Sequence, residues 1–198
     1  MLINTLITET GSQVLLVDQV FSKDRLNQLH AMCAEFSPGC EHWPQPDWCK
    51  PSGNMAGLNI PRYIFDNKGD EWAELVQFFS GDEFKHPFEQ HLGIDLEYST
   101  STMWADMKGF GALGPHKEAS GGYMMQVYLT DTPHDYSGTT IYNEAGQVLV
   151  QMPYRDNFAW FFNGVQVMHG RHHDVPEGIT RFTLQIWYYQ SLQNKNKL

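Results

Sequence analysis

The chain has 198 residues, 41% of them hydrophobic and 14% aromatic, so it is long enough and apolar enough for one globular domain. A formal net charge of −10 argues against nucleic acid as a partner, because an acidic surface repels phosphate groups. Residues 1–10 do not have the pattern of a signal peptide, and no apolar run is long enough to span a membrane. The three cysteines fit a reducing compartment. We therefore expect a cytoplasmic protein without a membrane partner.

The first half of the chain, residues 1–95, is predicted to form a helical cover with a lid. Its expected elements, in chain order, are a strand at 13–17, a helix from an N-cap at Ser22 to about Phe36, a strand at 62–65, and helices at 71–79 and 82–91. Residues 37–60 contain four prolines and several glycines, which predicts a long loop. Loops of this length in compact domains are usually functional or mobile, so we expect this one to form the lid.

From residue 96 the pattern changes to short strands about eight to twelve residues apart, separated by turn residues. The expected strands are 96–107, a short segment at His116, 123–130, 139–142, 148–152, 157–162, 165–169 and 180–189. Residues 143–146 are expected to close a hairpin, with Gly146 supplying a positive φ. The whole pattern predicts one domain over 1–198 of a mainly β, α+β class, whose core at 96–190 is a double-stranded β-helix, or jelly roll.

Two of these strands have one apolar and one polar face. In 180–189, Arg181 and Thr183 lie on the polar face. In 123–130, Tyr128 lies on the polar face. Two interpretations stay open: these faces meet solvent, or they line a cavity inside the jelly roll. In the second case Arg181 would serve a ligand carboxylate or phosphate, because a guanidinium is costly to bury without an anion.

A candidate metal site is formed by His116, Glu118 and His169. His116 and Glu118 are two apart on an extended segment, so their side chains share a face. Two imidazoles and one carboxylate suit Fe, Mn, Zn or Ni and leave positions open for other ligands. A chain with nine histidines also contains such a pair by chance, and His172 or His173 could take the place of His169.

A second group of potential metal ligands lies in the first half of the chain. Its members are His30, Cys33, Cys40, His42 and Cys49. Zinc is one interpretation, but the spacings contain no C-x2-C pair. Free buried thiols are the interpretation that we favour.

Over Met103 to Tyr189 the chain resembles Fe(II) and 2-oxoglutarate-dependent dioxygenases, and within them the prolyl-4-hydroxylase-like branch. The matching segments are GFGALGPHKEASGG, QVYLTDTP, SGTTIYN and MHGRHHDVPEGITRFTLQIWYY. The family pattern is H-x-D/E, a distal His often followed by Gly, and an Arg or Lys about ten to fourteen residues further on. The chain departs from the commoner pattern in one place: its acidic residue, Glu118, is a glutamate rather than an aspartate.

The resemblance implies a role for each matching residue. His116, Glu118 and His169 would bind iron. Arg181 and Thr183 would hold the distal carboxylate of 2-oxoglutarate, and Tyr128 matches a tyrosine that reaches this carboxylate in some members.

The implied activity is an oxygenase that hydroxylates a peptide, an amino acid or a small molecule. It would use molecular oxygen, release succinate and CO2, and take ascorbate as a possible reductant. Two alternatives stay open: a non-catalytic jelly-roll binding or structural protein with a vestigial metal site, and a metal enzyme that uses no 2-oxoglutarate. A nucleic-acid demethylase is not expected, because the chain is acidic.

Overall fold

The computed structural model describes residues 1–35, 49–51, 62–65, 69–107, 114–119, 121–130 and 138–191. Within these residues eleven strands form two antiparallel sheets, and there are three helices. The large sheet has the strand order β1-β2-β9-β6-β11-β5-β4-β3. Its strands are β1 Leu2–Ile7, β2 Gln13–Asp18, β3 Cys49–Pro51, β4 Arg62–Phe65, β5 Leu96–Asp106, β6 Tyr123–Leu129, β9 Phe158–Asn163 and β11 Arg181–Gln190.

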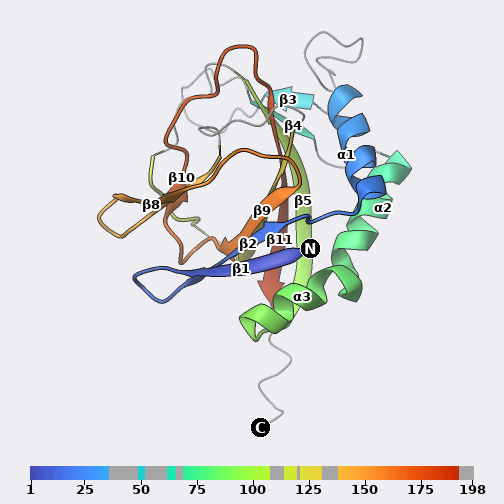
Figure 1. Ribbon diagram of the computed structural model, residues 1–198. Coiled ribbons are helices and arrows are strands. Elements are labelled where there is room, and N and C mark those ends of the chain that lie inside the picture. The colour runs from blue at the N-terminus through green and yellow to red at the C-terminus, as the bar shows by residue number, and fades with distance from the viewer. Residues whose placement is uncertain are drawn as a thin grey trace.

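The small sheet lies on the other side of the large sheet from the helices (Figure 1). Its order is β10-β7-β8, with bounds β7 Thr140–Tyr142, β8 Val148–Gln151 and β10 His169–Gly170. The β7–β8 hairpin turns at Gly146, whose φ of 77° is the predicted positive value. Two antiparallel sheets packed in this way form a jelly roll, so the predicted fold is confirmed.

Three helices cover the outer face of the large sheet, namely α1 Lys23–Glu35, α2 Gly69–Ser80 and α3 Asp82–Leu92 (Figure 1). The predicted N-cap of α1 is present, since Ser22 Oγ accepts a hydrogen bond of 3.4 Å from the amide of Arg25. Buried side chains of all three helices, such as Leu29, Leu75 and Phe88, belong to one core cluster with the outward-facing residues of the sheet.

The alternation of side chains along β11 separates this outer core from the space between the sheets. Leu184 and Ile186 point to the helices and are fully buried. Arg181 and Thr183 point the other way and line a cavity between the two sheets. The polar face of the strand is therefore internal, and the interpretation as a solvent-facing surface is wrong.

The structure also corrects three expectations about elements. The expected strand at 165–169 is reduced to His169–Gly170, because Asn163 begins a turn: its Oδ1 accepts a hydrogen bond of 3.1 Å from the amide of Val165. Strand β1 was not expected, and 1–95 contributes strands at both edges of the large sheet as well as helices. Within the predicted loop 37–60, residues 49–51 form β3, and the rest of the predicted lid lies outside the described residues.

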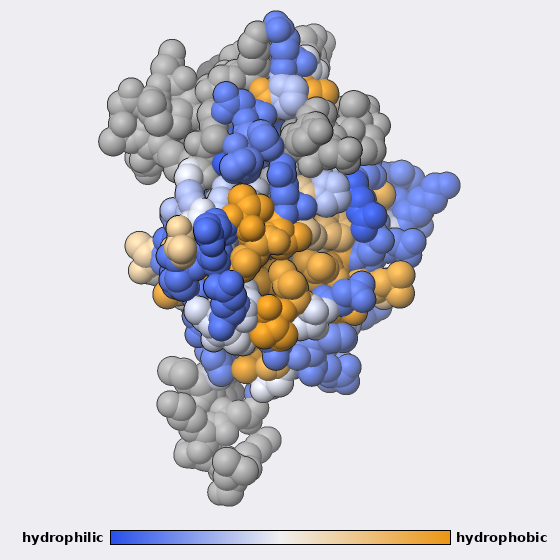
Figure 2. Space-filling view, turned by 60° about the vertical axis from the view of Figure 1, so that its left-hand side comes forward, coloured by the Kyte–Doolittle hydropathy of each residue, from blue (hydrophilic) through white to orange (hydrophobic). Residues whose placement is uncertain are grey.

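One face of the molecule carries a hydrophobic band between hydrophilic areas (Figure 2). Partly buried side chains of β1, β2 and β8, namely Leu6, Leu16 and Val150, pack against the core between the two sheets. This inner core therefore reaches the surface along the edges of the sheets. Among the described helices, none has the length and apolar character that would let it cross a membrane.

Candidate functional site

His116, Glu118 and His169 come together in space, as the spacing predicted. Glu118 Oε1 lies 3.3 Å from His169 Nε2 and 4.0 Å from His116 Nε2, and the candidate ligand atoms of all three lie within 4.8 Å of one another. Donor atoms that bind one metal ion at about 2.1 Å are about 3 Å apart when they are neighbours in the coordination sphere. Small side-chain rotations would thus bring all three onto one ion.

The backbone fixes the two histidines relative to each other. His116 and His169 form an isolated antiparallel bridge in which each amide donates a 2.9 Å hydrogen bond to the carbonyl of the other. This bridge adds the segment at His116 to the edge of the small sheet beside β10. It explains why two residues more than fifty positions apart present their rings together, with centroids 4.6 Å apart.

Each histidine is also oriented by its other ring nitrogen. His116 Nδ1 donates to the carbonyl of Gly114 at 2.9 Å, and His169 Nδ1 donates to the carbonyl of Val167 at 3.0 Å. A carbonyl can only accept, so Nδ1 carries a hydrogen in both rings. A bound metal would take the lone pair of each Nε2, and at His169 it would replace the hydrogen bond between Nε2 and Glu118. This donor set fits a divalent transition metal with open positions on one side.

The surroundings of Glu118 favour its ionised form, which an anionic ligand requires. The hydrogen bond with His169 lowers its pKa below the usual range, an effect that the charges of both histidines assist and that burial opposes. The carboxylate therefore stays ionised at neutral pH, which a cation ligand requires.

The other histidines and cysteines that the sequence offered as metal ligands are not part of this trio. His172 and His173 are exposed and pack against each other with ring centroids 4.7 Å apart. His30 lies 2.8 Å from Asp156 Oδ1, and Cys33 is a buried free thiol that contacts Met103 Sδ at 3.7 Å. Cys40 and His42 lie outside the described residues, as does the side chain of Cys49, so the zinc interpretation stays untested for them.

The metal-ligand trio opens into a cavity of about 380 Å³ between the sheets. His116, Glu118 and His169 form one part of its wall, and Arg181 and Thr183 of β11 form another. The volume lies in the range of small-ligand sites. One cavity thus holds both the predicted metal site and the predicted acid-binding arginine.

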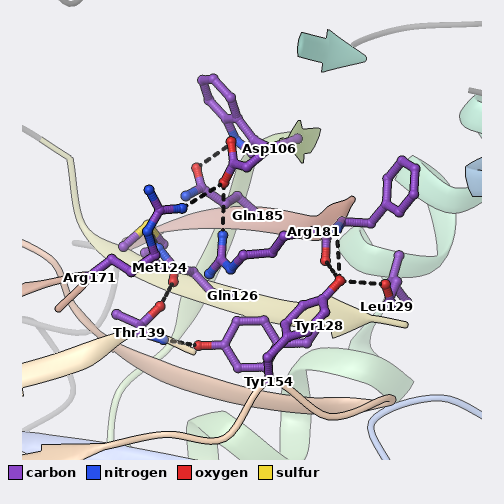
Figure 3. Close-up of polar contacts among 12 residues, drawn as sticks. Asp106, Met124, Gln126, Tyr128, Leu129, Thr139, Tyr154, Arg171, Arg181 and Gln185 are labelled. Atoms are coloured by element: carbon purple, nitrogen blue, oxygen red, sulfur yellow. Dashed lines mark hydrogen bonds and ion pairs between the residues drawn. The ribbon is translucent and has the colours of Figure 1, made fainter. Parts of the chain in front are cut away.

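Arg181 is buried, with 4% of its surface exposed, and it is anchored by Asp106. Asp106 ends β5 directly opposite Arg181 in the β5–β11 register, and its Oδ2 accepts a hydrogen bond of 3.0 Å from Arg181 Nη1. Arg171 Nη1 approaches the same oxygen at 3.6 Å from the segment that follows β10 (Figure 3). Sequence reasoning missed both Asp106 and Arg171, although Arg171 stands only two residues after His169.

Thr183 supplies an available hydroxyl group beside Arg181. Its Oγ1 is buried and makes no hydrogen bond within the part of the chain that the structure describes. A buried hydroxyl is usually satisfied, so this one fits a bound acceptor such as a carboxylate. Nearby, Thr139 Oγ1 donates to Gln126 Oε1 at 2.7 Å, which fixes the amide of Gln126 in the cavity wall (Figure 3).

Tyr128 is fully buried and lies behind the cavity lining rather than in it. Its hydroxyl accepts hydrogen bonds from the amide of Thr139 at 2.6 Å and from Trp160 Nε1 at 2.8 Å. The Arg181 guanidinium lies 5.3 Å from the centroid of the Tyr128 ring and 5.7 Å from that of Tyr154. The two rings therefore support Arg181 through cation–π contacts.

The fold has many counterparts among solved structures. A Pseudomonas putida prolyl-4-hydroxylase matches with a TM-score of 0.63 at 14% identity, over 92% of this chain and 95% of that one. HygX from Streptomyces hygroscopicus, solved with nickel, 2-oxoglutarate and hygromycin B, matches with a TM-score of 0.63 at 13% identity, over 91% and 84%. SnoN, an α-ketoglutarate-dependent epimerase from nogalamycin biosynthesis, matches with a TM-score of 0.65 at 14% identity, over 89% and 76%.

Sequence comparison alone finds less. No protein-family model matches the chain, and no curated protein matches it. The structural matches define the class: the chain has the jelly-roll fold of 2-oxoglutarate–Fe(II) oxygenases, with a prolyl-4-hydroxylase among its structural neighbours. The resemblance seen in the sequence is thus confirmed at the level of the fold.

Proposed function

We propose that the protein is an Fe(II)- and 2-oxoglutarate-dependent oxygenase that hydroxylates a peptide, an amino acid or a small molecule and releases succinate and CO2. One observation carries the proposal: two imidazoles and a carboxylate converge on one wall of a cavity whose other wall presents a buried arginine and a buried hydroxyl group. The first group suits a ferrous ion and the second suits an organic acid.

In this proposal His116, Glu118 and His169 hold the iron through Nε2, a carboxylate oxygen and Nε2. When bound, iron and 2-oxoglutarate supply the oxidising chemistry with molecular oxygen, and ascorbate serves to keep the metal reduced. The chain itself contributes the orientation of the imidazoles by the carbonyls of Gly114 and Val167.

Arg181 would bind the distal carboxylate of 2-oxoglutarate through its forked donors, with Thr183 donating a further hydrogen bond. Tyr128 would act indirectly, by packing its ring against the guanidinium of Arg181. This assignment differs from direct contact between Tyr128 and the acid, and it follows from the position of its hydroxyl between Thr139 and Trp160.

The rest of the cavity lining would receive the primary substrate. It includes Trp104 and Trp187, and Trp104 Nε1 donates to Gln185 Oε1 at 3.0 Å. Aromatic faces and amides suit a neutral group that stacks and forms hydrogen bonds. The structural neighbours HygX and SnoN have been solved with the small molecules hygromycin B and nogalamycin RO, which supports the small-molecule option.

The test is turnover of 2-oxoglutarate by the purified protein with Fe(II) and ascorbate, with and without candidate substrates, followed by succinate release. The Arg181→Ala variant is expected to raise KM for 2-oxoglutarate strongly, since the buried cation for the acid is lost. The proposal fails if succinate does not form and the metal-loaded protein does not bind 2-oxoglutarate. An unchanged KM would remove Arg181 from its role.

The non-catalytic alternative predicts a different result for metal binding. A vestigial site would bind no divalent ion specifically, whereas the proposed enzyme binds one per chain through three named residues. The distance of 3.3 Å between Glu118 Oε1 and His169 Nε2 is close to that between two ligand atoms of one metal ion, which favours the enzyme. Metal analysis of the purified protein distinguishes the two.

A further inference from the structure

Two glutamine amides lie next to each other on the large-sheet wall of the cavity. Gln126 of β6 and Gln185 of β11 are direct partners in the register of these two strands, and both line the cavity. Side chains that are direct partners point to the same face of a sheet, with their β-carbons about 5 Å apart. The two amide groups can therefore reach one bound group together.

Neighbouring side chains fix which end of each amide is available to a ligand. Trp104 Nε1 donates to Gln185 Oε1 at 3.0 Å, and an indole nitrogen can only donate, so the oxygen of Gln185 is engaged. Thr139 Oγ1 donates in the same way to Gln126 Oε1 at 2.7 Å (Figure 3). Both amide oxygens are thus bound within the protein, and the two NH2 groups are left to meet a ligand.

The NH2 groups have few acceptors within the protein. Gln126 Nε2 donates at 3.6 Å to Met124 Sδ, a weak acceptor that takes one of its two hydrogens. Gln185 Nε2 makes no hydrogen bond to the residues that the structure describes. Gln126 is only 7% exposed, and buried donors in native proteins are usually satisfied. The pair therefore fits an acceptor that a ligand supplies.

The burial of side chains along β11 shows which part of the cavity holds the pair. Arg181 and Thr183, which the proposed function assigns to the cosubstrate, are buried, whereas Gln185 and Trp187 are partly exposed. Two members of the metal-ligand trio are partly exposed as well. The amide pair thus lies on the open side of the cosubstrate residues, where a second molecule reaches the metal site.

We propose that Gln126 and Gln185 recognise a carbonyl oxygen of the primary substrate, and that the substrate is an amide: a peptide group, a carboxamide or a lactam. A carbonyl oxygen only accepts and has two lone pairs, one for each NH2 group. The indole of Trp187 in the same wall suits the flat, uncharged plane of an amide. The inference rests on the proposed function, because it names the substrate class of the same cavity.

The first experiment asks whether the cavity prefers a carbonyl group. Its probes are 2-pyrrolidinone and cyclopentanol, rings of one size that carry a lactam carbonyl and a hydroxyl group. The protein is loaded with Mn(II) and 2-oxoglutarate under nitrogen, and the relaxation of probe protons by Mn(II) reports binding close to the metal. The lactam is expected to bind about fivefold more tightly, because its oxygen accepts from both amides, whereas a hydroxyl group also brings a hydrogen that needs an acceptor.

Three variants make the result specific. Gln185→Glu replaces the NH2 group by an oxygen and keeps an acceptor for Trp104, and Gln185→Met removes the amide without adding a charge. Both are expected to lose the preference for the lactam. Gln190→Glu adds a charge on the same strand at an exposed position outside the cavity lining, and it is expected to keep the preference. The inference is overturned if the wild-type protein shows no preference, or if both folded Gln185 variants retain it.

The binding of 2-oxoglutarate decides whether the amides serve the substrate or the cosubstrate. Its dissociation constant, measured by calorimetry on the Mn(II)-loaded protein, is expected to stay close to the wild-type value in Gln185→Met and to rise strongly in Arg181→Ala. An equal rise in both variants would assign the amides to the cosubstrate, which overturns the inference and leaves the proposed function intact. If the wild-type protein neither binds 2-oxoglutarate nor forms succinate, the proposed function fails and the inference fails with it.

Discussion

The side chain of Glu118 occupies the space where residue 164 would carry a β-carbon. A Cβ added to Gly164 would lie 2.9 Å from Glu118 Cγ, and the amide of Glu118 donates a 3.0 Å hydrogen bond to the carbonyl of Gly164. The glycine therefore leaves room for the first part of the Glu118 side chain, the Cβ and Cγ atoms that an aspartate would also have. The proposed metal ligand Glu118 and Gly164 therefore fit against each other.

The Gly164→Ala variant is expected to displace Glu118 and to weaken metal binding by about tenfold, the effect of disturbing a residue that orients a ligand. Calorimetric titration with Mn(II) measures the change. Gly114→Ala is the matched control, because its added methyl group meets no described atom within 4 Å and the carbonyl that orients His116 is kept. Equal affinities in the two variants would contradict the argument.

The identity of the third metal ligand can be tested with three neighbouring histidines. His169→Ala is expected to abolish the rise in Tm that Mn(II) produces, because a ligand that binds only the folded state stabilises it. His172→Ala and His173→Ala are expected to keep that rise, since both residues are exposed and lie away from the trio. A variant of either that loses the response would move the ligand assignment to that residue.

The sequence contains enough information for the parts of the site that depend on local spacing. His116 and Glu118 share a face because they are two apart, and Arg181 and Thr183 share a face for the same reason. Alternation did not decide whether these faces meet solvent or line a cavity. In the structure the opposite face of β11, with Leu184, packs into the core beneath the helices, so Arg181 and Thr183 point into the cavity.

The parts that sequence reasoning missed depend on pairing between distant segments. Asp106 acts on Arg181 because the β5–β11 register sets them opposite each other, and no pattern within either strand fixes that register. Arg171 meets the same carboxylate only after the small sheet has folded over the large one. The prediction of a strand at 165–169 was wrong for a local reason. Apolar periodicity does not reveal the turn that begins at Asn163.

The role of Tyr128 can be decided by removing its hydroxyl. In the Tyr128→Phe variant the amide of Thr139 and Trp160 Nε1 lose their acceptor inside the protein. We expect a loss of about 1–3 kcal/mol in the free energy of unfolding, measured by urea denaturation, for the buried donors left unsatisfied. KM for 2-oxoglutarate is expected to change much less than in Arg181→Ala. A large rise in KM with unchanged stability would instead show direct contact with the acid.

Tyr154 connects the stability of the site to alkaline pH. Its buried hydroxyl accepts a hydrogen bond of 2.7 Å from the amide of Phe182 and lies 2.8 Å from the carbonyl of Leu129, so it ties the start of β11 to the end of β6. Burial raises the pKa of Tyr154 far above its ordinary value, although the charge of Arg181 acts in the opposite direction.

Because the folded state holds the phenol neutral, the contribution of Tyr154 is fully present below its unfolded pKa of about 10 and is lost as the pH rises above that value. The free energy of unfolding of the wild-type protein should therefore fall above pH about 10. Tyr154→Phe should be less stable at neutral pH by about 1–3 kcal/mol, since hydrogen bonds are lost, and its stability should fall less steeply with alkaline pH. Part of the fall should remain, because burial also raises the pKa of Tyr188. Urea denaturation on both sides of pH about 10 measures the two slopes, and identical slopes would show that Tyr154 does not govern the alkaline transition.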